Sequence, residues 1–180
     1  IMGPKLCPKI ILEGTRLTHK TDIALALNEH PRVVGPRRYR YHSPLISAEW
    51  CAFTPVAWGR GLVNFAPEEE ALAMETYRTW VRLLELQRHY SWIVDRFHIS
   101  TRAWQLQARG KDYDFRWLED RIRPLGFRIV LCTRAPQTFE AARAERDQAV
   151  SARQAAVVEL AEAAAARATL AQEAEELRAA

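Results

Sequence analysis

Short apolar runs alternate with longer helical segments along residues 9–135, and this alternation restricts the fold more than any other feature. Apolar runs at 9–12, 92–94 and 127–132 are typical of strands, and a further short piece at 32–35 is stopped by a proline. Such alternation favours β-α-β units, in which helices cover both faces of a parallel sheet. We therefore expect an α/β fold with a parallel sheet.

The expected helices lie between and after these runs. Pro67 is followed by three glutamates, the composition that a helix N-terminus prefers. Apolar residues at helical spacing continue from there to about Tyr90. The complete set of predicted helices covers residues 20–29, 46–53, 67–90, 100–122 and the chain from 136 onward.

The last 45 residues differ from the rest, because 17 of them are alanine. This composition predicts a long helix. Val150 and Val157 are spaced as in a heptad, as are Leu170 and Leu177, but the register slips between the two pairs. A helix packed on the body is therefore favoured over a coiled coil. We divide the chain into a domain at 1–147 and a helical extension at 148–180.

The net charge of +4 is unevenly distributed, with +7 on residues 1–135 and −3 on residues 136–180. An anionic ligand is therefore expected on the body. No apolar run reaches the length of a membrane span, so we expect no membrane partner. Cys7, Cys51 and Cys132 have no CxxC spacing, which argues against a disulfide framework or a zinc site and favours a reducing, cytoplasmic setting.

The segment after the first apolar run resembles a phosphate-binding loop of the form GxxxxGK[ST]. In such a loop backbone N–H groups surround the phosphates, the lysine binds their oxygens and the hydroxyl ligates Mg²⁺. Gly14, Lys20 and Thr21 stand at the required spacing, and His19 replaces the second glycine. The alternative is an ordinary turn before a helix, with a surface lysine. The candidate ATP-binding residues are Gly14, Thr15, Arg16, Thr18, His19, Lys20 and Thr21.

Asp95 and Arg96 form a second candidate site at the end of the apolar run 92–94. Ligands of open parallel sheets bind outside the carboxyl ends of the strands, where this pair and the loop after Glu13 are both expected. An aspartate can hold Mg²⁺ there, and an arginine can neutralise a phosphoryl oxygen. The alternative is a helix cap or a surface ion pair.

The sequence around Asp95 resembles the thymidylate kinase family. That family has an apolar strand ending in Glu-Gly, a phosphate loop and a later DRxxLSTxAYQ motif. This chain matches the motif, with conservative changes, at Asp95, Arg96, Ile99, Ser100, Thr101, Ala103, Trp104 and Gln105. Arg109-Gly110 and the arginines of 143–146 extend the resemblance, which covers about residues 9–35 and 66–147. It implies a P-loop NTPase-type fold and an enzyme that transfers the γ-phosphoryl group of ATP-Mg²⁺ to a nucleotide or nucleoside-like acceptor.

The resemblance also implies a role for each matching residue. Lys20 and Thr21 would hold the phosphates of ATP, and Thr21 and Asp95 would be the ligands of Mg²⁺. Arg143 and Arg146 would close over the transferring phosphoryl group; their alternative is a solvated helix surface with local ion pairs. The residues implied at the acceptor are Glu13, Arg96, Ser100, Thr101 and Gln105.

The chain departs from the family at several points. Arg16 stands where the family usually has an acidic residue, residues 35–41 replace an Arg-Glu-Pro-like stretch, and the alanine-rich helix takes the place of the last strand. These departures leave open a diverged, non-catalytic relative that acts as a nucleotide-binding or nucleic-acid-binding module. A third alternative is a scaffold whose C-terminal helix forms oligomers such as a homodimer.

The stretch from Arg37 to Tyr41 contains three arginines and two tyrosines, a composition that can stack on bases and contact phosphates. If residues 37–41 bind nucleic acid in this way, the acceptor of the phosphoryl group is a base or nucleotide within DNA. The alternative is a loop whose aromatic side chains pack on the body. Further aromatic residues of the same region are Trp50, Phe53, Trp58 and Phe65.

Overall fold

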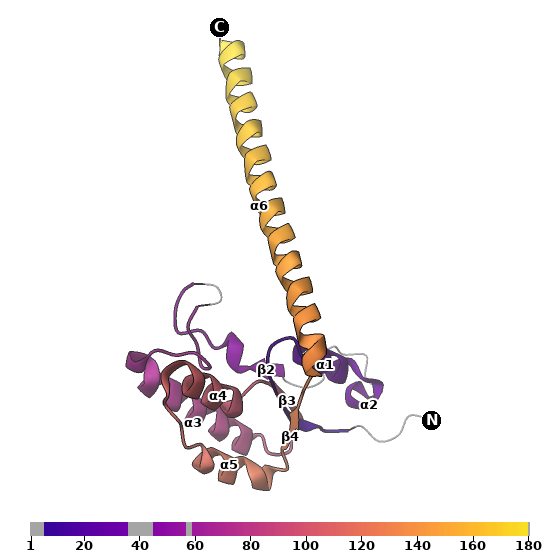
Figure 1. The fold of residues 1–180 in the computed structure, drawn as a ribbon, viewed down its shortest axis with the longest axis vertical. Helices are drawn as coiled ribbons and strands as arrows, with labels where there is room; N and C mark the ends of the chain where they lie inside the picture. The colour runs from indigo at the N-terminus through magenta and orange to yellow at the C-terminus, as the bar shows by residue number, and fades with distance from the viewer. Residues whose placement is uncertain (1–5, 36–44, 57–58, 180) are drawn as a thin grey trace. The chain divides into compact units, whose positions relative to one another are not determined.

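The computed structural model describes residues 6–35, 45–56 and 59–179 (Figure 1). They belong to two compact units, Ile1–Thr133 and Arg134–Ala180. The second unit consists of helix α6, Pro136–Ala179, so the predicted long C-terminal helix is confirmed. The sequence analysis placed the domain limit after residue 147, inside this helix.

The first unit is an α/β fold with a parallel sheet flanked by helices, as predicted. The strand order in the described sheet is β2-β3-β1-β4, and all neighbouring strands are parallel. Ile11 at the centre of β1 pairs with Val94 of β3 and with Ile129 of β4. The strands are β1 (Lys9–Glu13), β2 (Leu45–Ser47), β3 (Trp92–Asp95) and β4 (Arg128–Leu131).

Helices lie on both sides of this sheet: Figure 1 shows α1 and α2 on one side and α3, α4 and α5 on the other. Their bounds are α1 (Lys20–Glu29), α2 (Pro31–Val34), α3 (Glu70–Leu86), α4 (His98–Arg109) and α5 (Arg116–Ile122). Short 3₁₀ helices are η1 (Ala48–Trp50), η2 (Pro67–Glu69) and η3 (Arg123–Leu125).

Successive side chains of a strand point to opposite faces of the sheet, so the apolar residues of these strands lie in two cores. Ile11 and Val94 belong to the larger core, together with Tyr77 of α3 and other buried residues of α3 and α5. The neighbouring Leu12 and Ile93 face the opposite side and pack with α1. Both faces of the central strands are therefore covered, as continuous apolar runs in a parallel sheet require.

Two predicted elements are wrong. Residues 32–35 are not a strand, because Pro31 and the His30 side chain, which accepts a hydrogen bond from the Arg32 amide at 3.2 Å, begin helix α2 instead. The second strand is β2, in a segment where a helix over 46–53 was predicted. Only the 3₁₀ helix η1 follows it there.

The helices before and after β3 are confirmed with corrected ends. The Glu69 carboxylate accepts a hydrogen bond from the Ala66 amide at 2.7 Å and caps the beginning of the α3 segment, which ends at Leu86. The predicted helical stretch over 100–122 contains two helices, because Gly110 adopts a left-handed φ of 67° and ends α4. Across the part of the chain that the structure describes, we find no helix with the length and apolar character of a membrane span.

Candidate functional site

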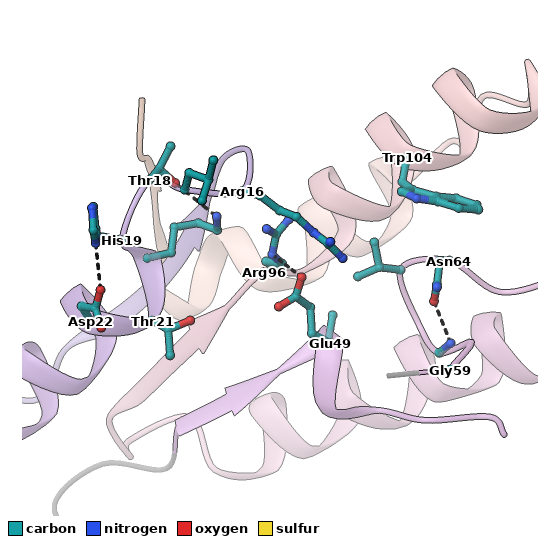
Figure 2. Close-up of a pocket in the computed structure, with 15 residues that line it drawn as sticks. Arg16, Thr18, His19, Thr21, Asp22, Glu49, Gly59, Asn64, Arg96 and Trp104 are labelled. Atoms are coloured by element: carbon teal, nitrogen blue, oxygen red, sulfur yellow. Dashed lines mark hydrogen bonds and ion pairs between the residues drawn. The ribbon is translucent and has the colours of Figure 1, made fainter. Parts of the chain in front are cut away.

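A cavity of about 580 Å³ lies at the carboxyl ends of β1, β2 and β3 (Figure 2). Its wall is formed by the loop between β1 and α1, by the turn after β2 and by the residue after β3. Figure 2 shows Arg16 and Arg96 extending toward the same region, with Trp104 at the far end. The lining residues are Arg16, Leu17, Thr18, His19, Lys20, Thr21, Asp22, Ala48, Glu49, Gly59, Gly61, Val63, Asn64, Arg96 and Trp104.

The loop between β1 and α1 needs glycine at its first position. Gly14 has a φ of 140°, and a Cβ atom there would lie 2.2 Å from the carbonyl oxygen of Cys132. At the other end of the loop His19 adopts a left-handed φ of 56°, a conformation that glycine takes without strain. A left-handed residue that is not glycine therefore stands where the phosphate-loop pattern has its second glycine.

Lys20 begins helix α1 and is 5% exposed. Its Nζ donates hydrogen bonds to the carbonyl oxygen of Thr15 and, at 3.2 Å, to the hydroxyl of Thr18. The ammonium is therefore folded back under the loop. Burial lowers the pKa of Lys20 below the usual lysine value, and the positive charge of Arg96 lowers this pKa further.

Thr21 and Asp95 meet although they are 74 positions apart in the sequence. The Thr21 hydroxyl donates to Oδ2 of Asp95 at 2.6 Å. Asp95 is 2% exposed, and its other oxygen, Oδ1, has no hydrogen-bond partner among the described residues. A buried carboxylate oxygen without a partner is costly, and a cation or a donor brought by a ligand would satisfy it.

Arg96 also has a left-handed backbone, with a φ of 61°. Its Nε lies 2.8 Å from Oε1 of Glu49, which comes from η1. Glu49 is a residue of the cavity that the sequence analysis did not select. Glu49 was not selected because a helix was predicted over 46–53. A predicted strand ending at Ser47 would have placed Glu49 just after a strand end, close to the position of Asp95 at the end of β3.

Glu13 and Ser100 contact each other. The buried Glu13 carboxylate accepts hydrogen bonds from the amides of Phe97 at 3.0 Å and Ile99 at 3.1 Å, and from the Ser100 hydroxyl at 2.5 Å. Burial raises the pKa of Glu13, and these three hydrogen bonds oppose the rise. Glu13 therefore caps the beginning of α4 and joins it to the end of β1.

Thr101 and Gln105 are fully buried on α4. The Thr101 hydroxyl bonds to the carbonyl oxygen of Leu62 at 3.0 Å, and the Gln105 amide donates to the carbonyl oxygen of Phe65 at 3.1 Å. These bonds fix the 62–65 segment, whose residue Asn64 lines the cavity. Thr101 and Gln105 therefore support a segment of the cavity wall without lining the cavity themselves.

The predicted site residues therefore separate into groups. Arg16, Thr18, His19, Lys20, Thr21 and Arg96 line one cavity. Arg143 and Arg146 lie on α6 in the second unit; both are exposed, and Arg146 pairs with Asp147 at 2.9 Å. The segment from Arg37 to Tyr41 lies outside the described residues.

No cluster of three or more histidine, cysteine, aspartate or glutamate side chains suited to a metal occurs in the described ranges. Mg²⁺, however, is commonly held by one or two protein ligands together with phosphate oxygens and water. The Thr21–Asp95 pair fits that type of site through its hydroxyl and its unpartnered carboxylate oxygen.

The fold and cavity define an α/β protein with a pocket at the carboxyl ends of β1, β2 and β3, lined by both basic and acidic side chains. Comparison with protein-family models, with curated proteins and with solved structures finds no significant match to this chain.

Proposed function

We propose that this chain is an ATP- and Mg²⁺-dependent phosphotransferase of P-loop type, with a nucleotide or nucleoside-like acceptor. The observation that supports it most is the 2.6 Å hydrogen bond between Thr21 and Asp95, beside Lys20 in the same site. Phosphate-loop enzymes hold Mg²⁺ with a loop hydroxyl and an aspartate from a neighbouring strand. The resemblance to thymidylate kinases agrees with this arrangement.

In this proposal each residue of the site binds a different part of the reacting complex. Mg²⁺, when bound, neutralises charge on the transferring phosphates, and Thr21 and Asp95 would hold it. Lys20 turns from Thr15 to the phosphates of ATP, and Arg96 binds the phosphate of the acceptor. For a monophosphate acceptor, a dianionic phosphate oxygen attacks the γ-phosphorus, the bond to the β,γ-bridging oxygen breaks and ADP leaves without a proton transfer.

A titration of ATP with and without Mg²⁺ tests the nucleotide site. We expect Lys20→Ala to weaken Mg²⁺-ATP binding at least about tenfold, because a charge-assisted contact to phosphate is lost. Lys9→Ala is the matched control: Nζ of Lys9 also donates to a backbone carbonyl, that of Leu125 at 2.7 Å, but Lys9 does not line the cavity. Absence of binding by the parent protein would overturn the proposal.

A screen of acceptors tests the transfer step. ADP formation is measured with nucleosides, nucleoside monophosphates and DNA in turn. We expect turnover with a monophosphate, because Arg96 lies close to Lys20 in the same cavity and can bind a second phosphate. Turnover with DNA alone would support the acceptor within nucleic acid instead.

A second candidate function is a nucleotide-binding module without transfer activity. It is favoured by the bonding of Glu13, Ser100 and Thr101, whose polar groups contact the protein itself. Nε2 of Gln105 also does so, while its Oε1 has no partner among the described residues. Mg²⁺-ATP binding without ADP formation on any acceptor would support this candidate. For either function we propose a reducing, cytoplasmic setting, since all three cysteines are free thiols.

A further inference from the structure

The position of Arg96 is set by its backbone. Its amide donates to the carbonyl oxygen of Leu12 at 2.9 Å, and its own carbonyl oxygen accepts from the Ala48 amide at 3.3 Å. These bonds tie Arg96 to β1 on one side and to the turn after β2 on the other. They hold a left-handed conformation that an arginine does not adopt by preference. The backbone thus directs the side chain to the cavity wall.

The Arg96 side chain is fixed by Glu49. Nε of Arg96 lies 2.8 Å from Oε1 of Glu49, and the side chains are 12% and 34% exposed, respectively. Figure 2 shows the pair inside the cavity. Glu49 is itself anchored, because its amide donates to the Ser47 hydroxyl at 3.2 Å.

This contact leaves most of the guanidinium available. A guanidinium has five N–H donors in one plane, and the ion pair with Glu49 lies on the Nε side of that plane. Fixing Nε orients the plane, and the terminal N–H groups can then bind a phosphate in a bidentate manner. Glu49 also counteracts the effect of Arg96 on the pKa of Lys20, because its negative charge raises that pKa.

We propose that Glu49 is a positioning residue that orients Arg96 for the phosphate group of the acceptor. This inference rests on the proposed function, because the anion assigned to Arg96 is the acceptor phosphate. Orientation in advance lowers the entropy lost when the phosphate binds. Glu49 itself does not contact the phosphate, and its effect passes through Arg96.

A competing effect of Glu49 has the opposite sign. If its negative charge mainly repels the incoming anion, then removal of the charge tightens anion binding. If Glu49 orients Arg96, removal of the oxygen that contacts Nε weakens binding. Glu49→Ala removes both the charge and the contacting oxygen, whereas Glu49→Gln removes the charge and keeps an oxygen at the same chain length. Glu49→Asp keeps the charge but draws the carboxylate oxygens back by one methylene.

The experiment is a calorimetric titration of inorganic phosphate into the full chain and its variants. We expect Glu49→Ala and Glu49→Asp to weaken phosphate binding about tenfold and Glu49→Gln to weaken it less than about threefold. In an Arg96→Ala background we expect the same substitutions to leave phosphate affinity unchanged. A general loss of stability would instead lower phosphate affinity in both backgrounds. The matched control is Glu85→Ala, which breaks a similar pair with Arg121 at 2.7 Å outside the cavity and leaves phosphate binding unchanged.

Four results would overturn the role of Glu49. The first two are tighter phosphate binding in both Glu49→Ala and Glu49→Gln, and an unchanged phosphate affinity in Glu49→Ala or Glu49→Asp. The other two are a change in phosphate affinity on substitution of Glu49 that persists in the Arg96→Ala background, and no phosphate binding by the parent protein. A parallel titration of Mg²⁺-ATP distinguishes failure of the role of Glu49 from failure of the proposed function. Lys20-dependent Mg²⁺-ATP binding with no response to Glu49 refutes the inference alone. The expected phosphate results without Mg²⁺-ATP binding refute the proposed function and retain Glu49 as the residue that orients Arg96 for an anion.

Discussion

Three non-glycine residues around the cavity have a positive φ: Leu17, His19 and Arg96. Each left-handed residue costs about 1–2 kcal/mol relative to a relaxed backbone. Such conformations persist only when their surroundings enforce them, and they concentrate at functional sites. Their presence on one cavity wall is a reason, independent of any motif, to place function there.

The strain at His19 gives the first prediction. His19→Gly relieves the left-handed strain and loses an exposed pair with Asp22 at 2.9 Å, which contributes little. We expect the free energy of unfolding to rise by about 0.5–1 kcal/mol, measured by urea titration. His30→Gly is the control: His30 has a φ of −63° and caps α2, so glycine destabilises there. Equal destabilisation by both substitutions would contradict the prediction.

His98 gives a prediction about pH. It is buried between aromatic rings, its Nε2 lies 3.2 Å from Oε1 of Glu119, and its Nδ1 has no hydrogen-bond partner among the described residues. Burial lowers the pKa of His98 below 6.5, while the charge of Glu119 and their hydrogen bond oppose this shift. The unfolded chain therefore binds more protons between the folded pKa and 6.5, so stability falls as pH falls through that window.

His98→Phe removes this dependence while keeping the aromatic packing. We expect the parent to lose up to about 1.4 kcal/mol of unfolding free energy per pH unit more than the variant within that window. Urea titrations at pH 7.5 and pH 5 measure the difference. Parallel slopes in the two proteins would show that His98 does not contribute.

At the scale of elements, the strands that the sequence predicted are those with continuous apolar runs. β1, β3 and β4 were found because each contains at least three neighbouring apolar residues, which favour a strand. β2 was missed because it has three residues, Leu45–Ser47, and its stability comes from pairing with β3. Tertiary pairing of this kind leaves no local signal.

The candidate site was predictable where a residue's position in the chain determines its place in the fold. Lys20, Thr21 and Asp95 follow predicted strands, so their meeting at one edge of the sheet could be inferred. The contacts of Glu13 and Gln105 could not, because the sequence does not tell whether a buried polar side chain faces a ligand or a backbone group. The structure shows that both bond to the backbone.

The junction between α1 and β3 gives a prediction about Mg²⁺. Asp95→Asn keeps an acceptor for the Thr21 hydroxyl but removes the negative charge that a divalent cation requires. We expect Mg²⁺ to strengthen ATP binding at least about tenfold in the parent and less than about threefold in the variant. Calorimetry with and without Mg²⁺ measures both values. Asp112→Asn, which alters an exposed pair with Arg102, serves as the control. An unchanged Mg²⁺ effect in Asp95→Asn would exclude Asp95 as a ligand.

At the scale of the whole molecule, the two units differ in how they are stabilised. The first unit has two apolar cores on either side of its sheet. The second is a 44-residue helix whose larger apolar side chains between 150 and 160 are more than half exposed. Alanine has the highest helix propensity, so the alanine content of this helix favours its formation. Folding and nucleotide binding are therefore expected to reside in the first unit.

Removal of the second unit tests how function divides between the units. We expect residues 1–133 to fold and to bind Mg²⁺-ATP within about threefold of the full chain, since every lining residue of the cavity lies in this part. If Arg143 and Arg146 close over the transferring phosphoryl group, as the resemblance to thymidylate kinases implies, phosphoryl transfer falls at least about 1,000-fold, because an arginine at the transferring group contributes that much. Arg143→Ala combined with Arg146→Ala in the full chain reproduces the loss if these arginines cause it. Full transfer activity in residues 1–133 would remove both arginines from the mechanism and place all of its cationic groups in the cavity.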